Sequence, residues 1–437
     1  MILIIGAGLA GLSTAYHLGS RNYQVCEKEQ EAGGLCRSYL KHGFTFDYTG
    51  HLLHTRQDYT RRLLDQLLPG RLSAHRRCAS ICAQGVLTPY PFQANLYKLP
   101  REIIKECLVG FCRAVEARAC ADSPSKVATN NNGEIPFKNW ILSVFGEGIA
   151  KYFMVPYNEK LWQTDLNRLS SDWVEWSIPV PTLEEVVGGA LGITNEHMGY
   201  SAQFLYPAEG GIGILPQSFL PHVNEVHYKK QLTAVDLKEK RVWFSGGDSL
   251  AYTRLVSTIP LTELLGMIRN LPPDIAEMKR GLRHISVLDV NLGIDRDGIT
   301  DQHWIYYPEQ SFPFYRAGCY SNFAAASAPS NATSLYLEIS YVPEMSLDKR
   351  AVINAAKEGL KRCGMLSGSD RVIAEDAVDI PYAYVIYDTF RKKNLPSIMN
   401  YLKSNEVWSI GRYGSWKYMS MEDAILEGKA AAEVIRG

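Results

Sequence analysis

Three glycines and one acidic residue near the start of the chain have the spacing of a phosphate-binding turn. Gly6, Gly8 and Gly11 follow a short apolar run, and Glu27 ends a second apolar stretch. Gly6 allows a tight turn, Gly8 lets the backbone approach a pyrophosphate, and Gly11 lets a helix pack closely on a strand. The N-terminus of that helix faces the phosphates, and Glu27 can accept hydrogen bonds from ribose hydroxyls. This stretch therefore predicts a strand, a glycine turn, a helix and a second strand that bind a dinucleotide.

Two arginines in the second half of the chain lie among aromatic residues, where they could bind phosphate. Arg316 ends the run PFYR, and Arg412 is the second residue of GRYG. A guanidinium group presents a planar fork of N–H donors to phosphate oxygens, so two of them can hold one diphosphate. A nucleotide sugar carries such a diphosphate. The alternative is that each arginine is structural and stacks on its aromatic neighbours.

The residues after Glu27 indicate which dinucleotide is bound. The run GGLCRS at residues 33–38 is followed by GFTFDYTGH at residues 43–51. This arrangement resembles the glutathione-reductase-like flavoproteins, which include amine oxidases, porphyrinogen oxidases and UDP-galactopyranose mutases, and it implies FAD. The alternatives are a surface role for Arg37 and a core role for His51. The cofactor contacts implied by the resemblance are Gly6, Gly8, Gly11, Glu27, Gly34, Leu35, Arg37, Gly50, His51, Val226, Gly411, Met421 and Glu422.

These residues must be positioned by helices and strands that the sequence also predicts. Periodicity and turn residues favour helices at residues 55–77, 137–153, 213–219, 347–363 and 421–435, with a helix break at Pro156 and a further helix capped by Ser170 or Ser171. A hairpin is expected at residues 78–87, a flexible loop at 121–135, and strands around Val226, Val235, Val242, 256–260, 286–292, 303–307, 335–341 and 407–411. In the flavoproteins that the chain resembles, the last helix directs its N-terminus at the flavin, where its dipole stabilises negative charge.

The expected fold class is α/β: a Rossmann-like FAD-binding domain with an inserted helical domain and an antiparallel sheet substrate domain. The FAD-binding domain is expected at residues 1–85, 203–284 and 401–437, the helical substrate domain at 86–202, and the sheet domain at 285–400.

Four further segments make the resemblance more specific. They are YPFQAN at residues 90–95, PYNEKLW at 156–162, WIYYPE at 304–309 running on to Arg316, and GRYGSWKY at 411–418. In this order they resemble the eukaryotic-type branch of the UDP-galactopyranose mutases, and the resemblance covers most of the chain. The alternative is a FAD-dependent oxidoreductase of the amine oxidase or protoporphyrinogen oxidase type.

The mutase resemblance implies a pyranose–furanose interconversion of a UDP-hexose through a bond between the sugar and N5 of reduced flavin. It implies FAD that is active when reduced, with NAD(P)H as the expected reductant, and catalytic roles for His51, Arg316 and Arg412. The substrate contacts that it implies are Tyr90, Gln93, Tyr157, Asn158, Trp162, Ser201, Tyr306, Arg316, Tyr387, Arg412 and Tyr418.

Three places depart from the pattern of the family. His54 replaces an aromatic residue, Ser201 replaces an asparagine, and the stretch at residues 419–421 is one residue shorter than usual. These differences concern the sugar and the base, so the substrate could be another nucleotide hexose.

Composition sets limits on other functions. The chain has 437 residues, 46% hydrophobic and 21% charged, with a formal net charge of zero, as in ordinary globular proteins. We expect no nucleic-acid partner, because no basic field is present, and no membrane partner, because no apolar run is long enough. The spacing of the nine cysteines fits neither a disulfide framework nor a metal site, so we expect no metal. The apolar start is too short for a signal peptide, and together with the cysteine spacing this leads us to expect a cytoplasmic protein.

Overall fold

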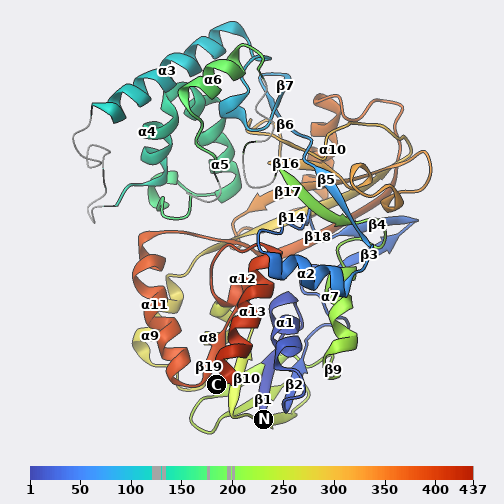
Figure 1. Ribbon diagram of the computed structural model, residues 1–437, viewed down its shortest axis with the longest axis vertical. Coiled ribbons are helices and arrows are strands. Elements are labelled where there is room, and N and C mark those ends of the chain that lie inside the picture. Colours follow the sequence, from blue (N-terminus) through green and yellow to red (C-terminus); the bar gives the residue numbers. More distant parts are fainter. Residues whose placement is uncertain (121–128, 130–133, 175–177, 194–197, 199–201, 437) are drawn as a thin grey trace.

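The computed structural model describes residues 1–120, 129, 134–174, 178–193, 198 and 202–436. Figure 1 shows three parts: the N-terminal βαβ unit with the C-terminal helix, a group of helices drawn at the upper left, and a large sheet drawn at the upper right. The predicted α/β class, with a Rossmann-like domain and an antiparallel sheet, is confirmed. None of the described helices combines the length and apolar character that a membrane span needs.

The nucleotide-type fold is built on a five-stranded parallel sheet. Its order is β19 (Val407–Ser409), β13 (Arg254–Ser257), β1 (Ile2–Ile5), β2 (Tyr23–Cys26) and β9 (Val226–His227). The strands are short and apolar, as expected where helices cover both faces of a sheet. Helices α1 (Leu9–Leu18) and α13 (Met421–Arg436) pack tightly, because a Cβ on Gly428 would lie 2.4 Å from the Ala10 carbonyl oxygen.

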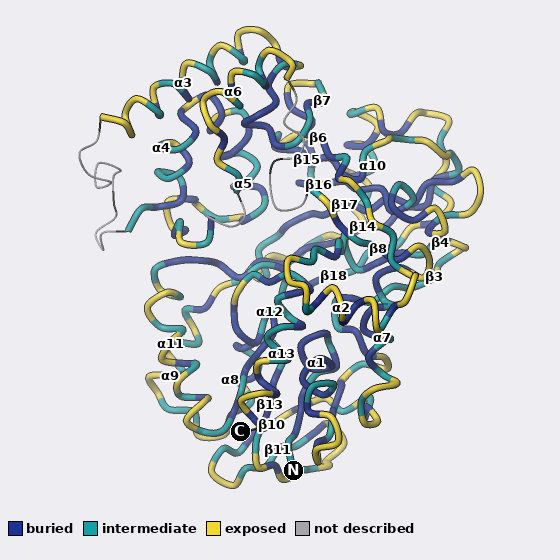
Figure 2. The backbone as a smooth tube through the Cα atoms, viewed as in Figure 1, coloured by how far each residue is buried: buried dark blue, intermediate teal, exposed yellow. Residues whose placement is uncertain are grey.

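The helical part follows the hairpin of β6 (Ala79–Ala83) and β7 (Val86–Pro89). It consists of α3 (Arg101–Ala119), α4 (Phe137–Ile149), α5 (Val155–Trp162) and α6 (Leu183–Ala190). A π-helical turn, Ala150–Met154, joins α4 to α5. The outer side of α3 is exposed while the inner sides of α4 and α5 are buried (Figure 2), so these helices share one apolar core.

The large sheet has seven strands. Their order is β18 (Val372–Val385), β14 (His284–Ile294), β17 (Thr333–Tyr341), β16 (Arg316–Cys319), β15 (Trp304–Tyr306), β6 and β7. All neighbours are antiparallel except β15 and β6, which run parallel. Strand β17 is almost wholly buried, and α10 (Lys349–Arg362) covers this part of the sheet. The sheet thereby places residues from distant parts of the sequence side by side.

Smaller elements complete the fold around these parts. Helices α7, α8, α9, α11 and the short α12 span Ile214–Phe219, Leu261–Met267, Pro273–Arg280, Thr389–Ser404 and Gly411–Gly414. Strands β10, β11 and β12 form a three-stranded sheet at Leu232–Asp236, Arg241–Phe244 and Ser249–Ala251, and β3 (Ser38–Lys41) pairs with β4 (Phe44–Asp47).

The structure corrects three sequence predictions. The helix expected at residues 55–77 is α2 (Asp58–Leu67) alone, because β5 (Leu72–Arg76) pairs instead with β8 (Gln203–Pro207). Pro156 does not break the chain's helical course, since it lies in the first turn of α5, where a missing N–H costs little. Ser170 forms an isolated bridge to Pro136, and neither Ser170 nor Ser171 begins a helix among the described residues, which leave out residues 175–177. The expected loop at residues 121–135 lies mostly outside the described residues.

Candidate active site

A cavity of about 810 Å³ reaches from the glycine turn to the helical part. It is lined by the N-terminus of α1, residues 48–52, α5, strands β15 and β16, and α12. Most of the residues predicted from the sequence lie together on its wall. They are Gly6, Gly8, Glu27, Gly34, Leu35, Arg37, Gly50, His51, Tyr90, Gln93, Tyr157, Asn158, Trp162, Tyr306, Arg316, Gly411, Arg412, Tyr418 and Met421.

Other predicted site residues lie away from this wall. Gly11 has a packing role, because a Cβ there would lie 2.0 Å from the Gly6 carbonyl oxygen. Val226 is buried in β9, where it pairs with Val25 and does not line the cavity. Ser201 lies outside the described residues.

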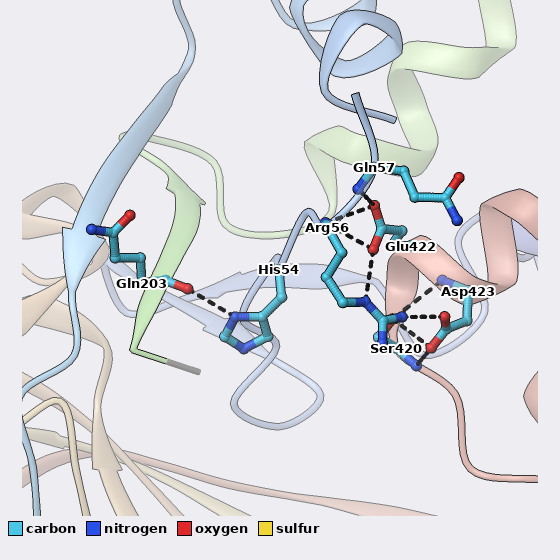
Figure 3. Close-up of polar contacts among 7 residues, drawn as sticks. All are labelled: His54, Arg56, Gln57, Gln203, Ser420, Glu422 and Asp423. Carbon is cyan, nitrogen blue, oxygen red and sulfur yellow. Dashed lines mark hydrogen bonds and ion pairs between the residues drawn. The ribbon is translucent and has the colours of Figure 1, made fainter. Parts of the chain in front are cut away.

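Tyr387 and Glu422 were also predicted as ligand contacts, and neither lines the cavity. The Tyr387 hydroxyl accepts a hydrogen bond from the backbone N–H of Tyr418 at 2.7 Å, so its polar atom has an internal partner. The side chain of Glu422 is fully buried and accepts hydrogen bonds from the backbone N–H groups of Arg56 and Gln57 (Figure 3). Its carboxylate therefore holds this loop to the start of α13.

The glycine turn provides a cradle for phosphate. Gly8 precedes α1, no side chain caps the helix there, and Gly8, Leu9 and Ala10 line the cavity. The first N–H groups of the helix and its dipole therefore favour an anion. A Cβ on Gly34 would lie 3.4 Å from Gly8 Cα, so side chains at these two positions would narrow the cradle.

Glu27 could accept hydrogen bonds from a ribose. Its Oε2 accepts the Ala7 N–H at 2.7 Å and its Oε1 accepts the Glu29 N–H at 3.0 Å. A carboxylate can accept about four hydrogen bonds, so both oxygens keep capacity for ribose hydroxyls. The carboxylate is thus fixed by the backbone while it lines the cavity.

Arg37 lines the same cavity as Glu27 and Gly50. Its Nε donates to the Gly34 carbonyl oxygen at 2.7 Å, and its guanidinium group lies 4.6 Å from the ring centroid of Tyr48. A cation fixed in this way can face the phosphates of a dinucleotide. Together with the cradle and Glu27, it makes the residues present a good fit for FAD.

His51 follows Gly50 on the cavity wall. Its Nδ1 is buried without a hydrogen-bond partner among the described residues. Burial, with a smaller contribution from Arg412, lowers the pKa of His51 to about 4. The imidazole is therefore neutral at pH 7, which suits a residue that packs beside a ligand better than one that carries a proton.

Arg316 is fixed by a buried carboxylate. Arg316 on β16 and Glu338 on β17 are register partners, and the guanidinium donates through Nε at 2.8 Å and Nη2 at 2.6 Å. Glu338 is 1% exposed and also accepts from the hydroxyl of Thr49. Burial alone would raise the pKa of Glu338, but Arg316 and these hydrogen bonds hold it below its ordinary value. Arg316 thus keeps its Nη1 side for a ligand.

Arg412 is held differently. Its Nη1 and Nη2 donate to the carbonyl oxygens of Met419 at 2.9 Å and Ala383 at 3.0 Å, and its guanidinium group lies 4.3 Å from the ring centroid of Tyr418. Among the described residues it forms no ion pair with a carboxylate. Arg412 is therefore a cation on the cavity wall whose charge has no paired anion, whereas the charge of Arg316 is offset by Glu338.

The far end of the cavity is aromatic with one unsatisfied amide. The Tyr90 and Tyr306 rings are 5.3 Å apart, and Tyr157 meets Tyr306 edge-on at 5.5 Å. Gln93 donates from Nε2 to the Pro179 carbonyl oxygen at 2.7 Å, and its buried Oε1 has no partner in the described chain. Because the Nε2 contact fixes the amide, Gln93 presents an acceptor.

Asn158 and Trp162 line the same end, but their polar atoms form hydrogen bonds to each other and to the π-helical turn before α5. Asn158 Nδ2 donates to the Met154 carbonyl oxygen at 2.7 Å, and Trp162 Nε1 donates to Asn158 Oδ1 at 3.3 Å. They therefore shape the wall more than they offer hydrogen bonds.

Trp304 is one of the lining residues that the sequence interpretation did not predict. Trp304 on β15 is 2% exposed, lines the cavity, and has a buried Nε1–H with no partner among the described residues. Alternate residues of a strand share a face. Since Tyr306 was expected to face the substrate, the strand period could have identified Trp304 two residues earlier.

Comparison with known proteins identifies the family of this chain. The family profile described as "Flavin containing amine oxidoreductase" matches residues 153–436, which is more than half of the chain. The chain belongs to this family. A profile for an NAD(P)-binding Rossmann-like domain matches residues 4–67, which include the glycine turn and Glu27. Both matches support FAD as the cofactor.

Solved structures with the same fold include enzymes of different activity. A structure of reduced UDP-galactopyranose mutase has a TM-score of 0.93 and 28% identity, covering 100% of this chain and 93% of that one. Putrescine oxidase bound to putrescine gives a TM-score of 0.69, 15% identity, and 100% and 98% coverage. A fatty acid isomerase from P. acnes gives 0.66, 13%, and 99% and 98% coverage. The last two share the fold alone, so function must be argued from the site.

Proposed function

We propose that this chain is a FAD-dependent nucleotide-sugar mutase that interconverts the pyranose and furanose forms of a UDP-hexose. The observation that carries the proposal is the presence of Arg316 and Arg412 in the same cavity as the glycine cradle and Glu27. FAD, when bound and reduced, supplies the nucleophile for the anomeric carbon of the sugar. An amine substrate offers no anion for two guanidinium groups, whereas a diphosphate does.

The two arginines would hold the diphosphate while its bond to the sugar is broken and formed again. Arg412 supplies net positive charge, because no carboxylate among the described residues pairs with it. Arg316 supplies directed N–H donors from a guanidinium whose other edge is fixed by Glu338. Donors fixed before the reaction stabilise the negative charge that develops on the phosphate oxygen as that bond breaks.

The far end of the cavity supports a uracil base. Gln93 Oε1 is a buried acceptor without a partner in the described chain. The imide N–H of uracil can donate to it, whereas cytosine has an acceptor at the same ring position. A buried acceptor facing another acceptor remains unsatisfied and costs about 1–3 kcal/mol. This supports UDP over CDP as the nucleotide carrier.

The remaining contacts are assigned by the same reasoning. We assign Tyr90, Tyr157, Tyr306 and Tyr418 to the aromatic wall around the nucleotide and His51 to a neutral packing role beside the flavin ring. We also propose NAD(P)H as the reductant and membership of the eukaryotic-type branch of the mutases, on the strength of the segments at residues 90–95, 156–162, 304–309 and 411–418.

Ligand titration tests this proposal. UDP, CDP and UDP-galactose are titrated separately into the FAD-loaded protein, and flavin fluorescence is followed. We expect saturable binding of UDP and UDP-galactose, with CDP weaker by about tenfold, the value that corresponds to 1.4 kcal/mol. Failure of every nucleotide to bind, together with peroxide formation from an amine, would favour the oxidoreductase alternative.

A further inference from the structure

The loop that carries His51 is attached to the start of the last helix. Glu422, the second residue of α13, accepts the backbone N–H of Arg56 at 2.9 and 3.0 Å and that of Gln57 at 3.0 Å (Figure 3). Its Oε2 also accepts from Arg56 Nε at 3.1 Å. The carboxylate is fully buried, and hydrogen bonds from these donors offset the free-energy cost of removing it from water.

Arg56 spans two carboxylates of the same helical turn. Its Nη2 donates to Asp423, which in turn accepts from the backbone N–H and the hydroxyl of Ser420 at 2.9 and 2.8 Å. Asp423 donates back from its own N–H to the Ser420 hydroxyl at 3.2 Å, so the helix begins with a reciprocal cap. The guanidinium group therefore joins the loop to the first turn of α13.

Both joined elements face the cavity. Gly50, His51 and Leu52 line it from the loop, and Ser420, Met421 and Ala424 line it from the start of α13. The adenosine end of FAD is assigned to Glu27, so the flavin ring is assigned to the part of the cavity beside His51 and Met421. This placement rests on one part of the proposed function, the binding of FAD, and not on the mutase reaction.

The charges at this turn act on the ring. The N-terminus of a helix carries partial positive charge and favours the negative charge that reduced flavin gains. Glu422 and Asp423 oppose that effect with two negative charges, and Arg56 offsets one of them. Without Arg56, the turn would present a field that disfavours reduction.

We propose that Arg56 is a positioning residue that acts through Glu422 and Asp423. It holds the His51 loop against α13 and offsets carboxylate charge there, and it thereby raises the reduction potential of the bound flavin. The reaction in question is the uptake of two electrons and a proton by FAD, with dithionite as reductant in vitro. No nucleotide sugar takes part, so the inference can be tested independently of mutase activity.

The test is an equilibrium reduction of the FAD-loaded protein against a reference dye of known potential. For Arg56→Met we expect the equilibrium to favour oxidised flavin about tenfold more than in the wild type. For a two-electron couple this lowers the reduction potential by about 29.6 mV. Arg56 is half-exposed, so the shift should shrink as salt is added. For Asp423→Asn we expect a shift of the opposite sign, because a negative charge is removed.

Arg61→Met is the matched control. It removes the same charge from an exposed arginine on α2, whose partner Asp58 lies 3.6 Å away on the surface. The equilibrium constant for reduction of its flavin should stay within about threefold of the wild-type value. An unchanged potential in Arg56→Met, or shifts of the same sign in Arg56→Met and Asp423→Asn, would overturn the inference. Wild-type protein that retains FAD but binds no UDP would refute the proposed function and leave this result standing.

Discussion

Replacement of Arg316 by methionine should destabilise the fold as well as the nucleotide complex. The change leaves Glu338 buried at 1% exposure without its ion-pair partner. Removal of one member of a buried ion pair typically costs about 3–5 kcal/mol, whereas replacement of both members by apolar residues is close to neutral. The double variant Arg316→Met/Glu338→Met should therefore recover most of this loss, apart from about 1 kcal/mol for the hydrogen bond of Thr49 to Glu338.

Two measurements separate the roles of the pair. Thermal unfolding of the FAD-loaded proteins should give the order wild type, double variant, single variant. UDP affinity should fall in both variants by roughly tenfold to a hundredfold, as expected for loss of about 1.5–3 kcal/mol of charged hydrogen bonding. A double variant no more stable than Arg316→Met would refute the account of the ion pair. Unchanged UDP affinity in both would refute the assignment of Arg316 to the diphosphate.

Two further predictions concern packing and pH. Gly50→Ala should weaken FAD retention in a gel-filtration assay, because the added Cβ would lie 2.3 Å from the Tyr336 hydroxyl. The control Gly368→Ala should retain FAD like the wild type, because no atom lies within 4 Å of the added Cβ. Burial lowers the pKa of Lys160 to about 7. Between about pH 7 and about pH 10, Lys160 therefore holds a proton in the unfolded chain but not in the folded one. Stability measured by unfolding should therefore rise with pH across this window, and the rise should be absent in Lys160→Met.

The nucleotide-binding fold was predictable because its signal is local. The glycines, the apolar strands and Glu27 lie within 27 residues, and each has a physical requirement that few other residues meet. The antiparallel strands around residues 286–292 and 335–341 were also visible as apolar runs, and they correspond to β14 and β17. The cavity then brings together residues that the flavoprotein resemblance had implied.

The remaining features depend on contacts between distant segments. The sequence of residues 72–76 favoured continuation of a helix, and only its pairing with β8, more than a hundred residues later, makes it a strand. Glu338 is a single acid in an apolar strand, and its role becomes visible only in register with Arg316. Glu422 was expected to contact the flavin because it lies at the start of the last helix. In the structure its carboxylate accepts hydrogen bonds from the backbone of Arg56 and Gln57, in a loop far away in the sequence.

The measurement that tests the central claim most directly is turnover of UDP-galactose by the anaerobically reduced protein. Products are separated by chromatography, and reducing equivalents are counted in the same reaction. We predict formation of the furanose isomer by the reduced protein, none by the oxidised protein, and no net consumption of reductant. Product formation that consumes NAD(P)H or oxygen in equal amount, or the absence of any isomer from reduced protein that binds UDP, would contradict the account.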